Sequence, residues 1–214
     1  YEMERIKYTT PYYDETLTGD YTMKSGETIV FETPDCWGNA LTEALTKGEL
    51  YAKGLEMNPC GGPVQVEGAE PGDTLKIDVI DIEVGEAGHL AIYKPEFGVL
   101  AKYLDGDQTI RVPVENGTAK LHGKYEIPIR PMLGVLAVTP PGEKLSTLLS
   151  GTYGGNMDCN ILNKGTTLYL PVQVEGAKLI TGDVHARQGN GEVLASLEIP
   201  AKITLKVELI KGRQ

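Results

Sequence analysis

The chain lacks the sequence signatures of several common enzyme classes. It contains no GxSxG, no HExxH, no GxxxxGKS/T and no GxGxxG segment that opens a helix. These motifs position a nucleophilic serine, a pair of zinc-binding histidines, or the phosphates of nucleotides and dinucleotides. Their absence argues against the commonest serine hydrolases, zinc peptidases, nucleotide binders and dehydrogenases.

Long apolar runs and paired cysteines are also missing. No segment approaches the roughly 20 apolar residues of a membrane-spanning helix, and the first residues lack the apolar core of a signal peptide. The three cysteines, Cys36, Cys60 and Cys159, form no CxxC pair. An odd count without a signal peptide is typical of a reducing compartment. We therefore expect a soluble, cytoplasmic protein with no membrane partner.

Stacking aromatics and positive charge are scarce as well. The 214 residues include two Phe and one Trp, against eleven Tyr, and the formal net charge is −10. Such a surface repels phosphate backbones, so nucleic acid is not an expected partner. A neutral small substrate is compatible with this charge, although solubility alone would explain it. The length suffices for a core without disulfides, and we expect one domain over residues 1–214.

Short β-type segments dominate what is present. They are rich in Val, Ile and Thr, end at Gly, Pro or Asp, and cover Thr28–Thr33, Thr74–Val84, Thr109–Pro113, Gly134–Thr139, Thr167–Val174 and Lys202–Ile210. The segment Asp105–Gly123 predicts a hairpin because it contains turn sequences. The segment Asn39–Leu55 has apolar residues at helical spacing but is interrupted by Gly48, so helix and loop both remain open. The pattern predicts a mainly β protein with little helix.

The sequence PVQVEGA occurs twice, at Pro63–Ala69 and Pro171–Ala177. A Gly-Asp pair follows each copy, at Gly72-Asp73 and Gly182-Asp183. The repeat predicts two related β units, each with a strand, a Gly-Asp turn and another strand. Two packed sheets, in a sandwich or jelly roll, are the expected architecture.

The second copy of the repeat continues into a polar segment. Asp183 and His185 are two residues apart, so in an extended strand both side chains emerge on one face, where they could bind a divalent metal. The Gly-Asn-Gly turn that follows would return Glu192 toward them. Taken singly, a histidine beside a turn is more often a structural residue than a ligand.

A second polar pair follows two adjacent glycines, Gly154 and Gly155. Asn156 and Asp158 are again two residues apart, in a position where a structural strand would alternate apolar residues. Their default reading is as turn residues that bond their own backbone. His89 and His122 lie near turns without carboxylates at ligand spacing. Cys36 and Cys159 lack a flanking histidine, which favours packed thiols over nucleophiles.

Several long segments of the chain resemble the acetamidase/formamidase family. They are SGETIVFETPDCWG, GGPVQVEGAEPGDTLKIDVIDI, PEFGVL, IPIRPMLGVLAVTP, YGGNMDCNIL and GTTLYLPVQVEGAKLITGDVHARQGNGEV, and the resemblance runs from about Lys24 to Ile210. This chain departs from the family pattern at two positions: relatives commonly have His in place of Tyr153 and Asp in place of Asn190. Relatives also continue well beyond Gln214, so we expect the chain to lack the C-terminal portion usual in the family.

The resemblance implies a jelly-roll-like β-sandwich and a metal-dependent amidohydrolase that cleaves short linear amides, such as formamide and acetamide, to the acid and ammonia. It also implies a homodimer or higher homo-oligomer. By the resemblance, the polar site of the family falls on Asn156, Asp158, Asp183, His185 and Glu192, with Asp35 as a further contributor. The first five are also the residues that the polar pairs and the turn single out.

The resulting hypothesis is metal-assisted hydrolysis. Asp158, Asp183 and His185 would hold a divalent ion, with zinc favoured by the imidazole and calcium left as the alternative by the carboxylates. The ion would lower the pKa of a bound water to about 7. Glu192 would act as general base, Asn156 would bind the amide, and Asp35 is a further catalytic candidate. The alternatives are a non-catalytic ligand-binding module and an amidase with Cys36 or Cys159 as nucleophile.

Overall fold

The computed structural model describes residues 3–42, 45–93, 100–103 and 105–213. The PEFGVL segment falls almost wholly outside these residues. One α-helix, α1 (Lys47–Ala52), and one 3₁₀ helix, η1 (Ala101–Tyr103), accompany the strands of this part of the chain. The strands are β1 (Arg5–Ile6), β2 (Thr9–Thr10), β3 (Tyr12–Tyr13), β4 (Thr22–Met23), β5 (Thr28–Thr33), β6 (Cys60–Val66), β7 (Thr74–Val84), β8 (Ala87–Ile92), β9 (Gln108–Glu115), β10 (Thr118–Leu121), β11 (Tyr125–Pro128), β12 (Met132–Ala137), β13 (Leu145–Ser146), β14 (Ser150–Gly151), β15 (Gly154–Asn156), β16 (Thr167–Pro171), β17 (Leu179–Arg187), β18 (Leu197–Glu198) and β19 (Ala201–Ile210).

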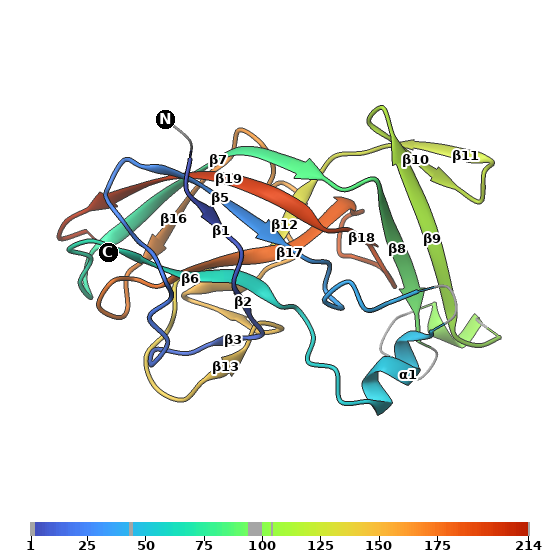
Figure 1. Cartoon of the computed structure of the whole chain (residues 1–214), viewed down its shortest axis with the longest axis horizontal. Helices are drawn as coiled ribbons and strands as arrows, with labels where there is room; N and C mark the ends of the chain where they lie inside the picture. The colour runs from blue at the N-terminus through green and yellow to red at the C-terminus, as the bar shows by residue number, and fades with distance from the viewer. Residues whose placement is uncertain (1–2, 43–44, 94–99, 104, 214) are drawn as a thin grey trace.

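The strands form two large sheets. A five-stranded sheet has the order β1-β5-β19-β7-β16, and β19 pairs antiparallel with both β5 and β7. A twelve-stranded sheet has the main order β11-β10-β9-β8-β18-β17-β12-β15-β14, with β2, β4 and β6 joined at one side. In Figure 1, β5, β7 and β19 run side by side above β6, β12 and β17, and β8 to β11 form an arm at the right. Strands β3 and β13 make a separate pair.

One core lies between the large sheets. It combines apolar residues of β5, β7 and β19 with those of β6, β12 and β17. All six residues of β12 are buried, as is β17 from Leu179 to Ala186. Strands covered on both faces read as near-continuous apolar runs, which holds for β12, whereas β17 also buries the polar residues Thr181, Asp183 and His185. A smaller cluster of Cys36, Trp37, Leu41, Leu50 and Ala91 lies under α1.

The prediction of a mainly β protein is confirmed, while the jelly-roll connectivity stays a prediction. The predicted segments Thr28–Thr33 and Thr74–Val84 are β5 and β7 residue for residue. The predicted hairpin is also confirmed, because β9 and β10 pair antiparallel around a turn. Asn116 and Gly117 form that turn with φ of 50° and 75°, the left-handed pair of a tight hairpin.

The open helix segment Asn39–Leu55 is helical only over Lys47–Ala52. Thr46 begins the helix with a capping box, in which its side chain accepts from the amide of Glu49 and the Glu49 carboxylate accepts from the amide of Thr46. Asn39 has φ of 61° and cannot start a helix, and residues 43–44 lie outside the described part. Gly48 lies inside the helix, and a Cβ there would come within 2.7 Å of the Tyr93 ring, so the packing of Tyr93 favours glycine at this position.

The two PVQVEGA copies lie against each other. The amide of Val66 donates to the carbonyl of Gly176 at 2.9 Å, and the amide of Gly176 donates to the carbonyl of Ala69 at 2.8 Å. The first Gly-Asp pair precedes β7 as predicted, but the expected second turn is wrong, since Gly182-Asp183 lies inside β17. Pairing of β17 with both β6 and β12 keeps this part of the chain within a strand instead of a turn.

Within the part of the chain that the structure describes, there is no helix with the length and apolar character needed to cross a bilayer.

Leu205 tests the position of the core. It is fully buried in β19, between β5 and β7, so Leu205→Ala should lower the free energy of unfolding by about 2–5 kcal/mol through lost burial and a residual cavity. Lys202→Ala, at an exposed position of the same strand, should change it by less than about 0.5 kcal/mol. Denaturant unfolding of both variants measures this, and equal effects would contradict the sheet packing.

Candidate active site

A cavity of about 480 Å³ lies where β17, β18 and the segment after β5 meet. Its polar lining comes from loops and strands and includes Lys47, Tyr51, Asn58, Asn156, Asp158, Asp183, His185, Glu192, Ser196 and Glu198. Apolar residues, among them Trp37, Met57 and Leu148, line the remainder. We call this space the acidic cavity, because four carboxylates face it.

Asp183 is held in an unusual conformation in the middle of β17. Its φ is 54°, in the left-handed region that a strand residue rarely adopts. It lies opposite Gly134 of β12, where a Cβ would come within 2.5 Å of Asp183 Oδ2. The same oxygen accepts a hydrogen bond from Asn58 Nδ2 at 2.9 Å. A glycine across the sheet and a buried amide therefore fix this carboxylate.

His185 is buried and held from both sides of its ring. Its Nδ1 lies 2.7 Å from Gln188 Oε1, and Gln188 Nε2 donates to the carbonyl of Asp158 at 2.5 Å. This orientation of the Gln188 amide makes Nδ1 the donor and directs Nε2 into the cavity. Nε2 lies 3.1 Å from Glu198 Oε1 and 3.5 Å from Asp183 Oδ1. Burial lowers the pKa of His185, but the two carboxylates outweigh it and raise the pKa well above its usual value.

Ser196 joins the two glutamates of the cavity. Its Oγ lies 2.5 Å from Glu192 Oε1 and 3.0 Å from Glu198 Oε1. A hydroxyl carries one proton and cannot donate a full hydrogen bond to both carboxylates. Gly191, with φ of 74°, turns the chain so that Glu192 faces the cavity from the loop between β17 and β18.

The cavity holds an excess of negative charge. Among its described lining residues, four carboxylates face one imidazole and the ammonium of Lys47. Burial, and then the carboxylates of Asp183 and Glu192, raise the pKa of Asp158 to about 8. Burial also raises the pKa of Glu198 to about 7, although His185 opposes the shift. In the absence of a cation, these groups therefore retain protons near neutral pH.

The donor set of the cavity fits a divalent cation. Asp158, His185 and Glu192 each offer a ligand atom within 4.8 Å of the others. Asn156 Oδ1, Asp158 Oδ1 and Glu198 Oε2 are buried and have no hydrogen-bond partner among the described residues. Unpaired buried oxygens are costly, and a cation would compensate for them.

The structure brings five of the six predicted site residues together, namely Asn156, Asp158, Asp183, His185 and Glu192. Their roles remain predictions. Asp35 is buried beside the cavity but is not among its lining residues. Its Oδ1 accepts from the amides of Trp37 and Asn39 at 3.0 and 2.7 Å, so it shapes the turn that presents Cys36.

Several residues of the site were not apparent from the sequence. Glu198 pairs with His185 only through the register of β17 and β18, and its sequence neighbours give no sign of it. Gln188 could have been expected, because buried histidine ligands commonly donate their second ring nitrogen to a fixed acceptor. Cys36 is buried and lines the cavity. Cys159 is exposed, so the expectation of a packed thiol at Cys159 is wrong. The Asp35 carboxylate lies 4.0 Å from His89, which therefore does face an acidic residue.

Comparison with known proteins gives a family for this arrangement. The sequence pattern of the acetamidase/formamidase family matches residues 13–149 and 142–214. The chain is similar to the acetamidase of Mycolicibacterium smegmatis, with 28% identity over 74% of this chain and 55% of the relative. It is also similar to the formamidase of Methylophilus methylotrophus, with 26% identity over 88% of this chain and 61% of the relative. The chain thus spans 55% and 61% of the lengths of these relatives.

Solved structures agree on the fold. An acetamidase from Bacillus halodurans has a TM-score of 0.92 and 36% identity, over 98% of this chain and 71% of that one. An acetamidase/formamidase from Thermoanaerobacter tengcongensis has a TM-score of 0.89 and 34% identity, over 98% and 70%. A γ-lactamase from Delftia acidovorans, at 22% identity and a TM-score of 0.84, shares the fold.

The charge of the cavity predicts how stability depends on pH. The pKa values of Asp158, Glu198 and His185 are all raised in the folded state, so the folded protein binds more protons than the unfolded chain between about pH 4 and 8. The free energy of unfolding must then fall as pH rises through this range. In the presence of chelator, we expect the free energy of unfolding to fall by about 2 kcal/mol or more from pH 6 to 8. Each kcal/mol lost lowers Tm by roughly 2–4 °C.

Thermal unfolding at both pH values measures this loss, and Asp158→Asn should reduce it. A metal-free protein that becomes more stable toward pH 8 would contradict the assigned pKa directions.

Proposed function

Because the chain belongs to the acetamidase/formamidase family, we propose that its acidic cavity hydrolyses the C–N bond of short linear amides to a carboxylic acid and ammonia. One observation carries the proposal. Three side chains converge within 4.8 Å in a cavity open to a small molecule. They are the imidazole of His185, the carboxylate of Asp158 as candidate ligand and the carboxylate of Glu192 as candidate base. The names of the similar proteins, acetamidase and formamidase, support the same class of substrate.

We assign the cation of this reaction to Asp158, Asp183 and His185. The unpaired oxygen of Asp158 and the surplus of carboxylates support a divalent ion. The imidazole nitrogen favours zinc, and calcium is the alternative that the carboxylates leave open. When bound, such an ion polarises a carbonyl oxygen and lowers the pKa of a coordinated water. Gln188 keeps His185 in the tautomer that leaves Nε2 available to it.

Glu192 is the proposed general base. It is partly exposed to the cavity, and Ser196 holds its Oε1, so the carboxylate can take a proton from the attacking water and return it to the leaving nitrogen. Asn156, whose Oδ1 has no partner among the described residues, would accept a hydrogen bond from the amide NH₂ group. Together these steps convert amide and water into acid and ammonia.

The walls of the cavity fit a neutral substrate. Trp37, Met57 and Leu148 provide an apolar side for a short acyl group, whereas a second carboxylate on the substrate would meet the negative charge of the site. Homo-oligomeric assembly and a cytoplasmic location stay predictions.

A cysteine nucleophile is the weaker candidate mechanism. Burial, and then the carboxylates of Glu198 and Asp183, raise the pKa of Cys36 well above its usual value. A thiol in this environment remains protonated and is a poor nucleophile. Cys159 is exposed and does not line the cavity.

Ammonia release from formamide and acetamide tests the proposal. We expect activity that chelator removes and zinc restores. Glu192→Gln should lower kcat by about 10²–10⁴-fold, because it removes the base while keeping the shape of the side chain. His185→Ala should abolish cation-dependent activity.

Glu115→Gln, an exposed substitution of the same type in β9, is the matched control and should leave the rate unchanged. Activity that survives both chelator and His185→Ala would remove the cation from the mechanism. Tight amide binding without turnover would select a ligand-binding module, and inactivation by thiol alkylation that Cys36→Ala prevents would select the cysteine mechanism.

A further inference from the structure

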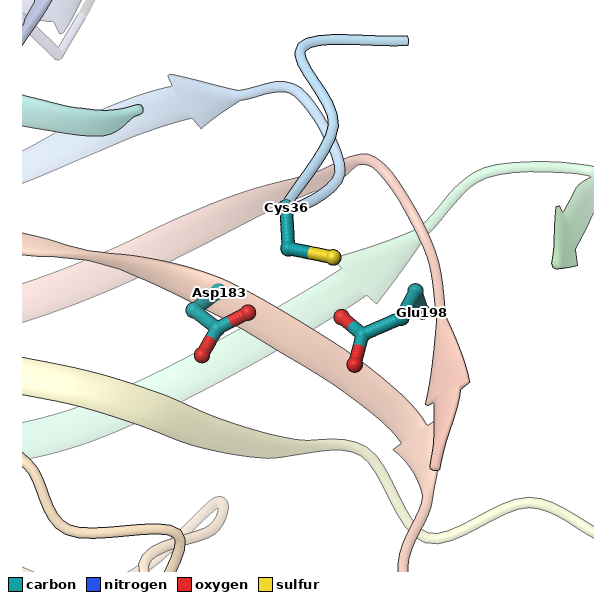
Figure 2. A group of neighbouring side chains, drawn as sticks. All are labelled: Cys36, Asp183 and Glu198. Atoms are coloured by element: carbon teal, nitrogen blue, oxygen red, sulfur yellow. The ribbon is translucent and has the colours of Figure 1, made fainter. Parts of the chain in front are cut away.

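A second group of potential metal ligands lies beside His185 in the acidic cavity. Cys36, Asp183 and Glu198 each place a ligand atom within 4.8 Å of the others, and all three residues are buried. They come from the loop after β5, from β17 and from β18. Figure 2 shows the thiol and both carboxyl groups turned toward a common point. The loop after β5 and two consecutive strands near the end of the chain thus bring three ligand groups together.

The Glu198 side chain is an independent sign of a missing partner at this point. Glu198 is 8% exposed, and its Oε2 has no hydrogen-bond partner within the described residues. Its Oε1 lies 3.1 Å from His185 Nε2, whereas Ser196 Oγ, at 3.0 Å, has its shorter contact with Glu192. The carboxylate cannot turn Oε2 toward another donor without losing the contact with His185. A buried oxygen in this state is destabilising unless a positive group lies next to it.

The chemistry of the group selects the kind of partner. A thiolate with two carboxylates suits a borderline ion such as Zn²⁺, whereas Mg²⁺ and Ca²⁺ prefer oxygen ligands alone. We infer that Cys36, Asp183 and Glu198 form a second cation site for a zinc-like ion, which makes the acidic cavity a two-cation centre. On binding, a bond from sulfur to the ion forms, the S–H bond breaks and the proton leaves to solvent.

Asp183 links the two sites. Its Oδ1 lies 3.5 Å from His185 Nε2, a ligand of the first cation, and its carboxylate also belongs to the second group. Paired cations in hydrolases lie about 3.5–4 Å apart and commonly share a carboxylate. The meaning of the second site for amide hydrolysis rests on the proposed function, but its existence does not, because cation binding is measured without turnover.

The competing explanation is a thiol that only packs. Cys36 also belongs to the small apolar cluster with Trp37 and Leu41, and free cysteines are common in such clusters. A packed thiol would not respond to a cation in the cavity. The two explanations therefore differ in a spectroscopic property of the sulfur.

Cobalt loading distinguishes them. The full chain is stripped with chelator and titrated with Co²⁺, while the absorption of thiolate-to-cobalt charge transfer is followed in the near ultraviolet. We expect the band to develop in the wild-type protein and to be absent from Cys36→Ser, and zinc analysis should show about one equivalent fewer in this variant. Glu198→Gln should weaken binding at the sulfur-containing site by more than roughly tenfold.

Cys159→Ser, which removes an exposed thiol that does not line the cavity, is the matched control and should retain the band. Thermal unfolding of each variant checks that it folds; if Cys36→Ser does not, Glu198→Gln decides the question. A saturated wild-type protein without the band, or equal zinc content in wild type and Cys36→Ser, would overturn the second site. A charge-transfer band in a protein without amidase activity would uphold this inference and refute the proposed function, whereas amidase activity with one bound ion and no band would do the reverse.

Discussion

The burial of several carboxylates around one histidine is the constraint on which the site depends. Asp183 and Glu198 lie 3.5 and 3.1 Å from His185 Nε2, in a part of the protein where water cannot screen their repulsion. One imidazolium and the ammonium of Lys47 cannot neutralise these two carboxylates together with Asp158 and Glu192. The protein must therefore hold extra protons or bind a cation, and only the second solution also removes the unpaired oxygens.

The surrounding fold supplies the rigidity that such a site requires. Strand β17 lies in the interior of the larger sheet, between β12 and β18, and is buried along almost its whole length. Asp183 adopts its left-handed conformation only because Gly134 leaves space across the pair and Asn58 holds the carboxylate. A strained residue persists where neighbouring contacts fix it more strongly than its own preference opposes it, and strained residues of this kind cluster at functional sites.

The sequence predicted the strands well where they are central and apolar. Segments such as Thr28–Thr33 and Thr74–Val84 are fixed by local preference and burial together, so their limits agree with β5 and β7. The helix was ambiguous because its start depends on the Thr46 capping box rather than on apolar spacing. The second Gly-Asp turn failed for a different reason. The same two residues form a turn or a strand according to their partners, and β12 and β6 lie beside only the second pair.

The site shows the same division between local and distant information. Residues two apart on one strand, such as Asp183 and His185, are visible in the sequence because their side chains share a face. Glu198 is not visible, and Cys36 is visible only as a candidate nucleophile, since the pairing of β18 with β17 and the turn after β5 bring the two into the cavity of His185. The same distinction explains Asp35, which the resemblance places next to the chemistry. In the folded chain its carboxylate accepts hydrogen bonds from the amides of Trp37 and Asn39, and the thiol of the neighbouring Cys36 reaches the cavity.

A site assembled from distant segments therefore gains candidate ligands that residue spacing in the sequence cannot reveal. The candidates gained here are those that could hold a second ion.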